Sequence, residues 1–179
     1  MFEPLVGVVV IAGFFIGGLL AKISPEEMKP GRVYFVWLLQ ALALLITASI
    51  VYYSNFSLYG IALMLMGMAF GVFIREYYLH IGMAVAASLF IDSRAIVLIG
   101  ALTFIFSIVH GTLSFSFGKF TLKRITPRMI FFALPFLMLL VDVTPGLPMS
   151  FALGAFASSI IIKPFRPFRP LLQRKPSKQ

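Results

Sequence analysis

Long stretches without a charged residue make up most of this chain, and short polar segments separate them. A bilayer core about 30 Å thick is crossed by about 20 apolar residues in a helix. Charge-free stretches near that length therefore predict membrane-spanning helices. They cover residues 4–21, 33–74, 81–91, 95–118, 129–141 and 150–162.

The stretch 33–74 is long enough for two helices, and the break is predicted at Ser54 and Asn55 because small polar residues favour a turn. Seven helical segments follow, of which 81–91, 129–141 and 150–162 are short. The last two could instead form a re-entrant hairpin, since irregular backbone is tolerated at membrane depth where protein or a cavity surrounds it.

The predicted fold is therefore an all-α integral membrane protein with six to seven transmembrane helices, with a C-terminal re-entrant hairpin as the alternative for the last two. Residues 1–163 form the predicted transmembrane domain, and residues 164–179 form a basic tail rich in Pro, Phe and Arg.

Composition supports a membrane location. Of the 179 residues, 60% are hydrophobic and 12% are charged, whereas soluble domains carry roughly 45–50% apolar and about 25% charged residues. A soluble fold of this size leaves too much surface exposed to hide so many apolar side chains. The N-terminus lacks the basic start and the cleavage site of a secretory signal, so the first segment is predicted to be retained.

The basic residues predict an orientation. Loops rich in Lys and Arg stay on the cytoplasmic side of a membrane. With the N-terminus outside and every segment crossing, the outer side holds only Arg94. The inner side then holds Lys22, Lys29, Arg32, Arg75, Lys119, Lys123, Arg124, Arg128, Lys163 and the five bases of the tail. We therefore expect a multi-pass protein of the cell membrane with a cytoplasmic C-terminus.

The net charge of +9 points to anionic lipid headgroups as partners rather than to nucleic acid, because the bases flank apolar segments. The C-terminal residues predicted to contact headgroups are Lys163, at the end of the transmembrane domain, and Arg166, Arg169, Arg174 and Lys175 of the tail. Proline at every third position between 164 and 170 favours polyproline II, which places Phe and Arg side chains on different edges.

Four polar residues are candidates for a transport path or proton relay: Gln40, Glu76, His80 and His110. Ionisable groups within a membrane are costly and usually functional. Glu76 and His80 are four residues apart and would share one face of a helix. The alternative is that Glu76 and its neighbours form a solvated loop at the membrane surface.

Asp92 and Asp142 are the candidates for catalysis, because paired aspartates can activate water in an intramembrane aspartyl hydrolase. The simpler interpretation is that both residues form turns, Asp92 pairing with Arg94 and Asp142 capping before Pro145.

No metal and no cofactor is predicted. The chain has no cysteine, which excludes disulfides and thiolate ligands. His110 is alone in its segment, and a zinc site would need more ligands. The sequence also lacks a phosphate-binding loop, so an enzymatic role is the less favoured one.

Small residues four apart let two helices approach closely. This spacing occurs at Gly13 and Gly17, at Gly67 and Gly71, and at Gly154 and Ser158. Packing within one chain and assembly into an oligomer both explain it.

These observations favour a small transporter or channel-like module of unknown substrate. A non-catalytic subunit or assembly factor of a membrane complex is the second hypothesis, and the aspartyl hydrolase is the third. We expect the chain to be a homo-oligomer or part of a larger membrane complex.

Overall fold

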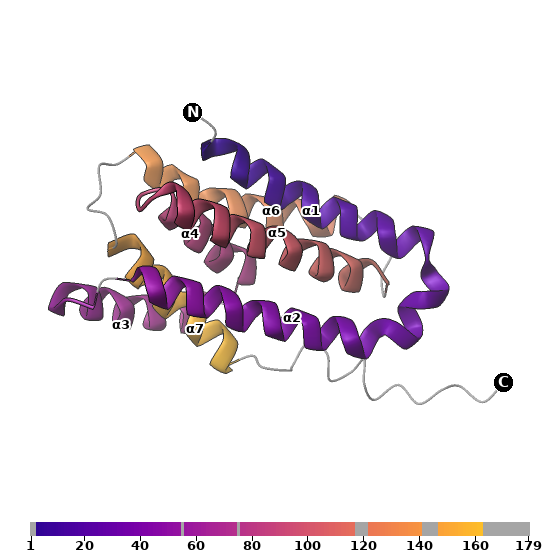
Figure 1. The fold of residues 1–179 in the computed structure, drawn as a ribbon, viewed down its shortest axis with the longest axis horizontal. Helices are drawn as coiled ribbons and strands as arrows, with labels where there is room; N and C mark the ends of the chain where they lie inside the picture. The colour runs from indigo at the N-terminus through magenta and orange to yellow at the C-terminus, as the bar shows by residue number, and fades with distance from the viewer. Residues whose placement is uncertain (1–2, 55, 75, 117–121, 141–146, 163–179) are drawn as a thin grey trace.

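The computed structural model describes residues 3–54, 56–74, 76–116, 122–140 and 147–162, and all regular structure in these ranges is helical (Figure 1). The prediction of an all-α chain is confirmed for this part. The elements are α1 (Glu3–Ile23), α2 (Pro25–Tyr53), α3 (Leu58–Phe73), α4 (Tyr77–Ser88), α5 (Ser93–Ser116), α6 (Leu122–Ala133), the 3₁₀ helix η1 (Leu134–Leu140) and α7 (Leu147–Ile162).

Within the described part of the chain, three helices are long and apolar enough to cross a membrane. These segments are Leu5–Ile23, Pro30–Tyr53 and Ser93–Ser116, within α1, α2 and α5. The helices α3 and α4 are apolar but have only 16 and 12 residues. At about 1.5 Å per residue they measure about 24 and 18 Å, less than the bilayer core. A membrane location is therefore compatible with the structure.

The predicted break in the stretch 33–74 is correct, because α2 ends at Tyr53 and α3 begins at Leu58. The Ser57 side chain caps α3 by accepting a hydrogen bond from the Gly60 N–H at 3.2 Å. Serine is a favoured N-cap because its oxygen satisfies a backbone donor that has no partner within the helix.

The sixth helix begins at Leu122, seven residues before the predicted start at 129. Charge-free length is a poor guide here because Arg128 lies inside the helix. The α-helix then changes to a 3₁₀ helix at Leu134, next to Pro135. Proline has no backbone N–H and clashes with the preceding turn, which interrupts an α-helix.

The helices α1 and α5 are parallel and in close contact. A side chain at Gly17 would place its Cβ 2.8 Å from the Thr112 backbone nitrogen, and closer still to the Ile108 carbonyl oxygen. In return, Gly111 lies against the Phe14 backbone. The Thr112 hydroxyl donates a hydrogen bond to the Gly17 carbonyl oxygen at 3.1 Å. Only glycine permits this approach of two backbones.

The helices α3 and α7 form a second parallel pair of the same kind. Gly67 lies against the Phe151 backbone, Gly154 lies against the Met64 backbone, and Gly71 lies against Ser158. The glycine spacings found in the sequence therefore lie at contacts within one chain.

The short helix α4 is at the centre of the bundle. Every residue from Tyr78 to Ser88 is buried, and α4 packs against α5, α6, η1 and α7. Tyr78 contacts His110, near the end of α5, while only residues 89–92 join α4 to the start of α5. Thus α4 runs antiparallel to α5. The helix is mostly apolar and has no charged residue, which favours a place in the interior.

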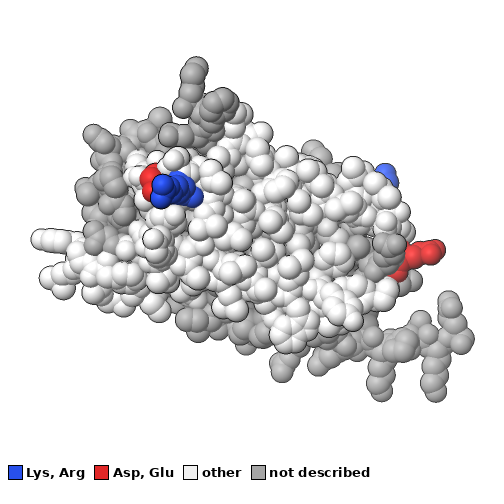
Figure 2. Space-filling model, in the orientation of Figure 1, with Lys and Arg blue, Asp and Glu red and all other residues white. Residues whose placement is uncertain are grey.

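The outer helix α2 is apolar on both faces. Its buried stripe consists of Leu39, Leu42, Ala43, Ile46 and Ile50, while Tyr34, Trp37, Leu44 and Tyr52 on other faces are 64–81% exposed. The face of the molecule drawn in Figure 2 carries its described charges at the two ends, with uncharged atoms between them. An apolar surface with charged ends suits a bilayer.

Candidate functional site

Two side-chain hydroxyl groups lie close to the ring of His110. The Tyr78 hydroxyl is 2.5 Å from His110 Nδ1, and the Ser114 hydroxyl is 3.4 Å from the same nitrogen. Tyr78 comes from the first turn of α4, while His110 and Ser114 are one turn apart on α5. Residues four apart share a helix face, so both hydroxyls approach one ring nitrogen.

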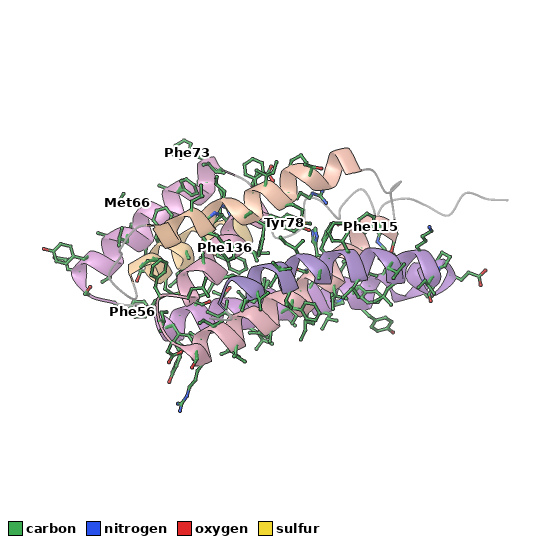
Figure 3. The ribbon with its side chains drawn as sticks, turned by 90° about the horizontal axis from the view of Figure 1, so that it is seen from above. Phe56, Met66, Phe73, Tyr78, Phe115 and Phe136 are labelled. Atoms are coloured by element: carbon green, nitrogen blue, oxygen red, sulfur yellow. The ribbon has the colours of Figure 1, made fainter. Side chains whose placement is uncertain are left out.

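Aromatic rings fix the orientation of this histidine. The Phe106 and Phe14 rings stack on the His110 ring, with centroid distances of 6.0 and 6.2 Å and interplanar angles of 10° and 28°. The Tyr78 ring meets it edge-on at 5.3 Å. Figure 3 shows Tyr78 among the helices, whereas Phe73 projects outward from α3. The imidazole is therefore held between α1, α4 and α5.

Arg128 brings a positive charge to the same place. Its guanidinium carbon lies 5.8 Å from the centroid of the Tyr78 ring, which is a cation–π contact. Four residues later, Phe132 on α6 meets Gly82 on α4, so the two helices run parallel. This register places Arg128 beside the first turn of α4.

The cluster of Tyr78, His110, Ser114 and Arg128, called the polar cluster below, lies beside the middle of α1, with Tyr78 buried and the other three residues half-buried. The Tyr78 and Phe14 ring centroids are 5.7 Å apart. Phe14 precedes Ile23, the last residue of α1, by nine residues, which is about 13 Å along the helix. The start of α4 therefore lies beside the middle of the first apolar helix.

The polar cluster contains groups that can bind a polar solute and groups that can transfer a proton. A neutral tyrosine hydroxyl can donate its proton to Nδ1, and the neutral imidazole then carries its own proton on Nε2. An imidazole has one nitrogen that accepts a proton and one that donates a proton, and guanidinium groups bind oxyanions. Together these groups could hold a polar solute or pass a proton.

The other predicted path residues lie apart from this cluster. Glu76 is exposed and is the N-cap residue of α4, with extended backbone and no capping hydrogen bond from its side chain. His80 is 0% exposed, two residues from Tyr78, and its ring approaches Phe70 of α3 at 6.4 Å. Residues two apart on a helix point in nearly opposite directions. Gln40 is partly exposed on α2.

The Asp92 carboxylate caps α5. Its Oδ1 accepts a hydrogen bond from the Ala95 N–H at 2.6 Å, and the residue is exposed. This is the geometry of a helix N-cap. The described residues do not include Asp142, Arg75 or the five C-terminal residues predicted to contact lipid.

Sequence reasoning did not select Tyr78, Ser114 or Arg128. The spacing of His110 and Ser114 is a signal that was present, because residues four apart meet on one helix face. Tyr78 and Arg128 gave no such signal, since both fall in segments predicted as loops. Within the described ranges, no three His, Asp or Glu side chains are grouped as metal ligands would be.

Comparison with models of known protein families, with curated proteins and with solved structures finds no match to this chain.

Proposed function

We propose that this chain is a small multi-pass transport or channel-like module, with its N-terminus outside the cell and its C-terminus in the cytoplasm. In this account the polar cluster is the site through which a small polar solute passes. The observation that carries the proposal is the position of four polar side chains beside the middle of α1. Polar groups at that depth are expensive and are usually retained for function.

The directions of the helices support six to seven crossings. The pairs α1 and α5, α3 and α7, and α4 and α6 are each parallel, as deduced from their glycine contacts. Helices that cross a membrane one after another alternate in direction, so members two or four places apart are parallel. The short helices α3 and α4 then cover only part of the thickness, with the start of α4 inside it.

Exposed aromatic residues support the same placement of the helices in the membrane. Tyr34 and Tyr52 of α2 are 77% and 81% exposed and are 18 residues apart, which is about 27 Å along the helix. Tyrosine and tryptophan gather at both surfaces of a bilayer, and Trp37 lies near the first of these levels. The spacing matches an apolar core about 30 Å thick.

Glu76 indicates which end of the cluster meets water. Its side chain is exposed two residues before Tyr78, and a carboxylate at this depth needs a hydrated cavity or a partner. We infer that a water-filled vestibule reaches from the cytoplasmic side to the start of α4. Beyond Tyr78, the Phe14 and Phe106 rings against His110 close the path, so transport requires these contacts to open.

The proposal is tested with the purified chain in proteoliposomes. Proton flux is measured with an enclosed pH dye, and entry of acetate, phosphate, potassium and glycerol by light scattering. We expect flux of at least one solute above protein-free liposomes, lost in His110→Ala and kept in Ser49→Ala. The Ser49 hydroxyl only bonds to the Leu45 carbonyl within α2, so Ser49→Ala is a matched control.

Two results would contradict transport. The first is a flux equal to that of empty liposomes for every solute, with the protein folded and inserted. The second is a flux that His110→Ala leaves unchanged. The mass of the native particle in mild detergent would then decide between a solitary chain and a subunit of a larger complex.

A further inference from the structure

We propose that Arg128 and the start of α4 form a binding site for an oxyanion, a phosphate or carboxylate group. The inference deepens the proposed function and rests on it for the role of the site in transport, because it names the chemical class of the solute. The binding site itself is argued from the charges and contacts around Arg128.

The first observation is a cation with no acidic partner among the described residues. Arg128 is half-buried, and its described contact is with the Tyr78 ring. Within the described part of the chain, no Asp or Glu lies within ion-pair distance of Arg128. An arginine at membrane depth costs about 2.5–3.5 kcal/mol even by the milder scales. A counter-charge from outside the chain would offset that cost.

The second observation is the chemistry of the neighbouring groups. The Tyr78 hydroxyl lies within hydrogen-bond distance of His110 Nδ1, and in the tautomer in which this nitrogen accepts, the neutral imidazole carries its N–H on Nε2, which is a donor. A guanidinium presents a planar fork of N–H groups that matches the oxygens of a phosphate or carboxylate. The cluster is therefore rich in donors and carries a positive charge.

The third observation concerns the end of α4. A helix N-terminus carries partial positive charge, and here the Glu76 side chain makes no capping hydrogen bond. An anion beside Arg128 would meet this end as well. Glu76 is the nearby negative charge that would compete with an anion, although its exposed side chain can turn toward water. Glu76→Gln should therefore leave the affinity for the anion unchanged or raise it.

A phosphate group could come from free phosphate or from a lipid headgroup. Both present the same oxygens to a guanidinium, and the test separates them. The chain is purified in a non-ionic sugar detergent without phospholipid, and inorganic phosphate is titrated by calorimetry. In a second arm, phosphatidylglycerol is added and lipid retention is measured by native mass spectrometry.

We expect phosphate to bind the natural chain and Arg94→Gln alike, because Arg94 is exposed at the far end of α5. Arg128→Gln should weaken binding at least tenfold. Arg128→Lys keeps the charge but loses the fork, and should give an intermediate affinity. Helix content and elution volume show whether each variant is folded. If Arg128→Gln fails to fold, the affinities of Arg128→Lys and Arg94→Gln for phosphate are compared instead. Weaker binding by Arg128→Lys supports the inference, and equal binding contradicts it.

Retention of phosphatidylglycerol that depends on Arg128, without binding of free phosphate, would support the oxyanion site and identify a lipid as its ligand. Binding of either ligand within twofold in Arg128→Gln, or no binding of either by the natural chain, overturns the inference. Flux that depends on His110 but not on Arg128 would support the transport proposal and refute the anion-binding site. Anion binding without any flux would support the binding site and refute transport.

Discussion

Replacement of Gly17 by alanine tests the contact between α1 and α5 that frames the polar cluster. The new Cβ would lie 2.8 Å from the Ile108 carbonyl carbon and from the Thr112 nitrogen. Ordinary contacts begin at 3.4 Å, so these two atoms alone require the backbones to separate by 3.4 − 2.8 = 0.6 Å. The Ile108 carbonyl oxygen would lie closer still and requires a larger separation. Backbone atoms cannot rotate away as the end of a side chain can.

The magnitude follows from two terms. Overpacking of this kind costs about 1–3 kcal/mol. Separation of the helices also weakens the hydrogen bond from the Thr112 hydroxyl to the Gly17 carbonyl. Its loss costs at most about 0.6 kcal/mol, the average in membrane proteins, because the same hydroxyl also reaches the Ile108 carbonyl at 2.9 Å. Alanine regains up to about 1 kcal/mol of helix propensity over glycine. A matched glycine variant removes this last term from the comparison.

Gly31→Ala is that control. Its Cβ would meet only the Phe35 ring, at 3.3 Å, and a ring edge can shift by a few tenths of an ångström. The free energy of unfolding, measured by denaturant titration in mixed micelles, should be lower in Gly17→Ala than in Gly31→Ala by about 1–3.6 kcal/mol. Equal stabilities of the two variants would refute the close approach of α1 and α5.

Two further substitutions probe the cap and the cluster. Asp92→Ala removes the acceptor of the Ala95 N–H and should lower the free energy of unfolding by about 1 kcal/mol, while Asp92→Asn keeps most of it; no loss in either variant would count against the cap. Tyr78→Phe removes the hydroxyl bound to His110 and should cost about 0.6–1.7 kcal/mol, whereas Tyr52→Phe, on an exposed side chain, should cost nothing measurable in the same titration.

Much of the helical organisation could be predicted from the sequence. Charge-free length located α1, α2 and α5 because a bilayer core selects for long apolar segments. The break at Ser54 and Asn55 was predicted from local turn chemistry. The start of α6 was not predicted, because charge-free length cannot locate a helix that contains Arg128.

The site was predicted only in part. His110 was selected because an ionisable residue in an apolar segment is unusual. Its partner Tyr78 could not be, because 32 residues separate them in the chain and tertiary packing alone brings them together. Glu76 and His80 have the spacing of one helix face, but α4 starts after Glu76. Whether these two residues share a helix face therefore depends on where α4 begins, and their spacing in the sequence does not determine that boundary.

A hydrated start of α4 within the membrane is what transport and anion binding both require. The chain has no natural cysteine, so Glu76→Cys carries a single fluorophore, and Glu26→Cys at the exposed start of α2 gives the surface reference. Depth is measured with lipids that carry a quencher at known positions, and hydration with aqueous iodide. We expect position 76 to lie deeper than position 26 and still to be quenched by iodide. Equal depth at the two positions, or a deep position that iodide does not reach, would contradict the account.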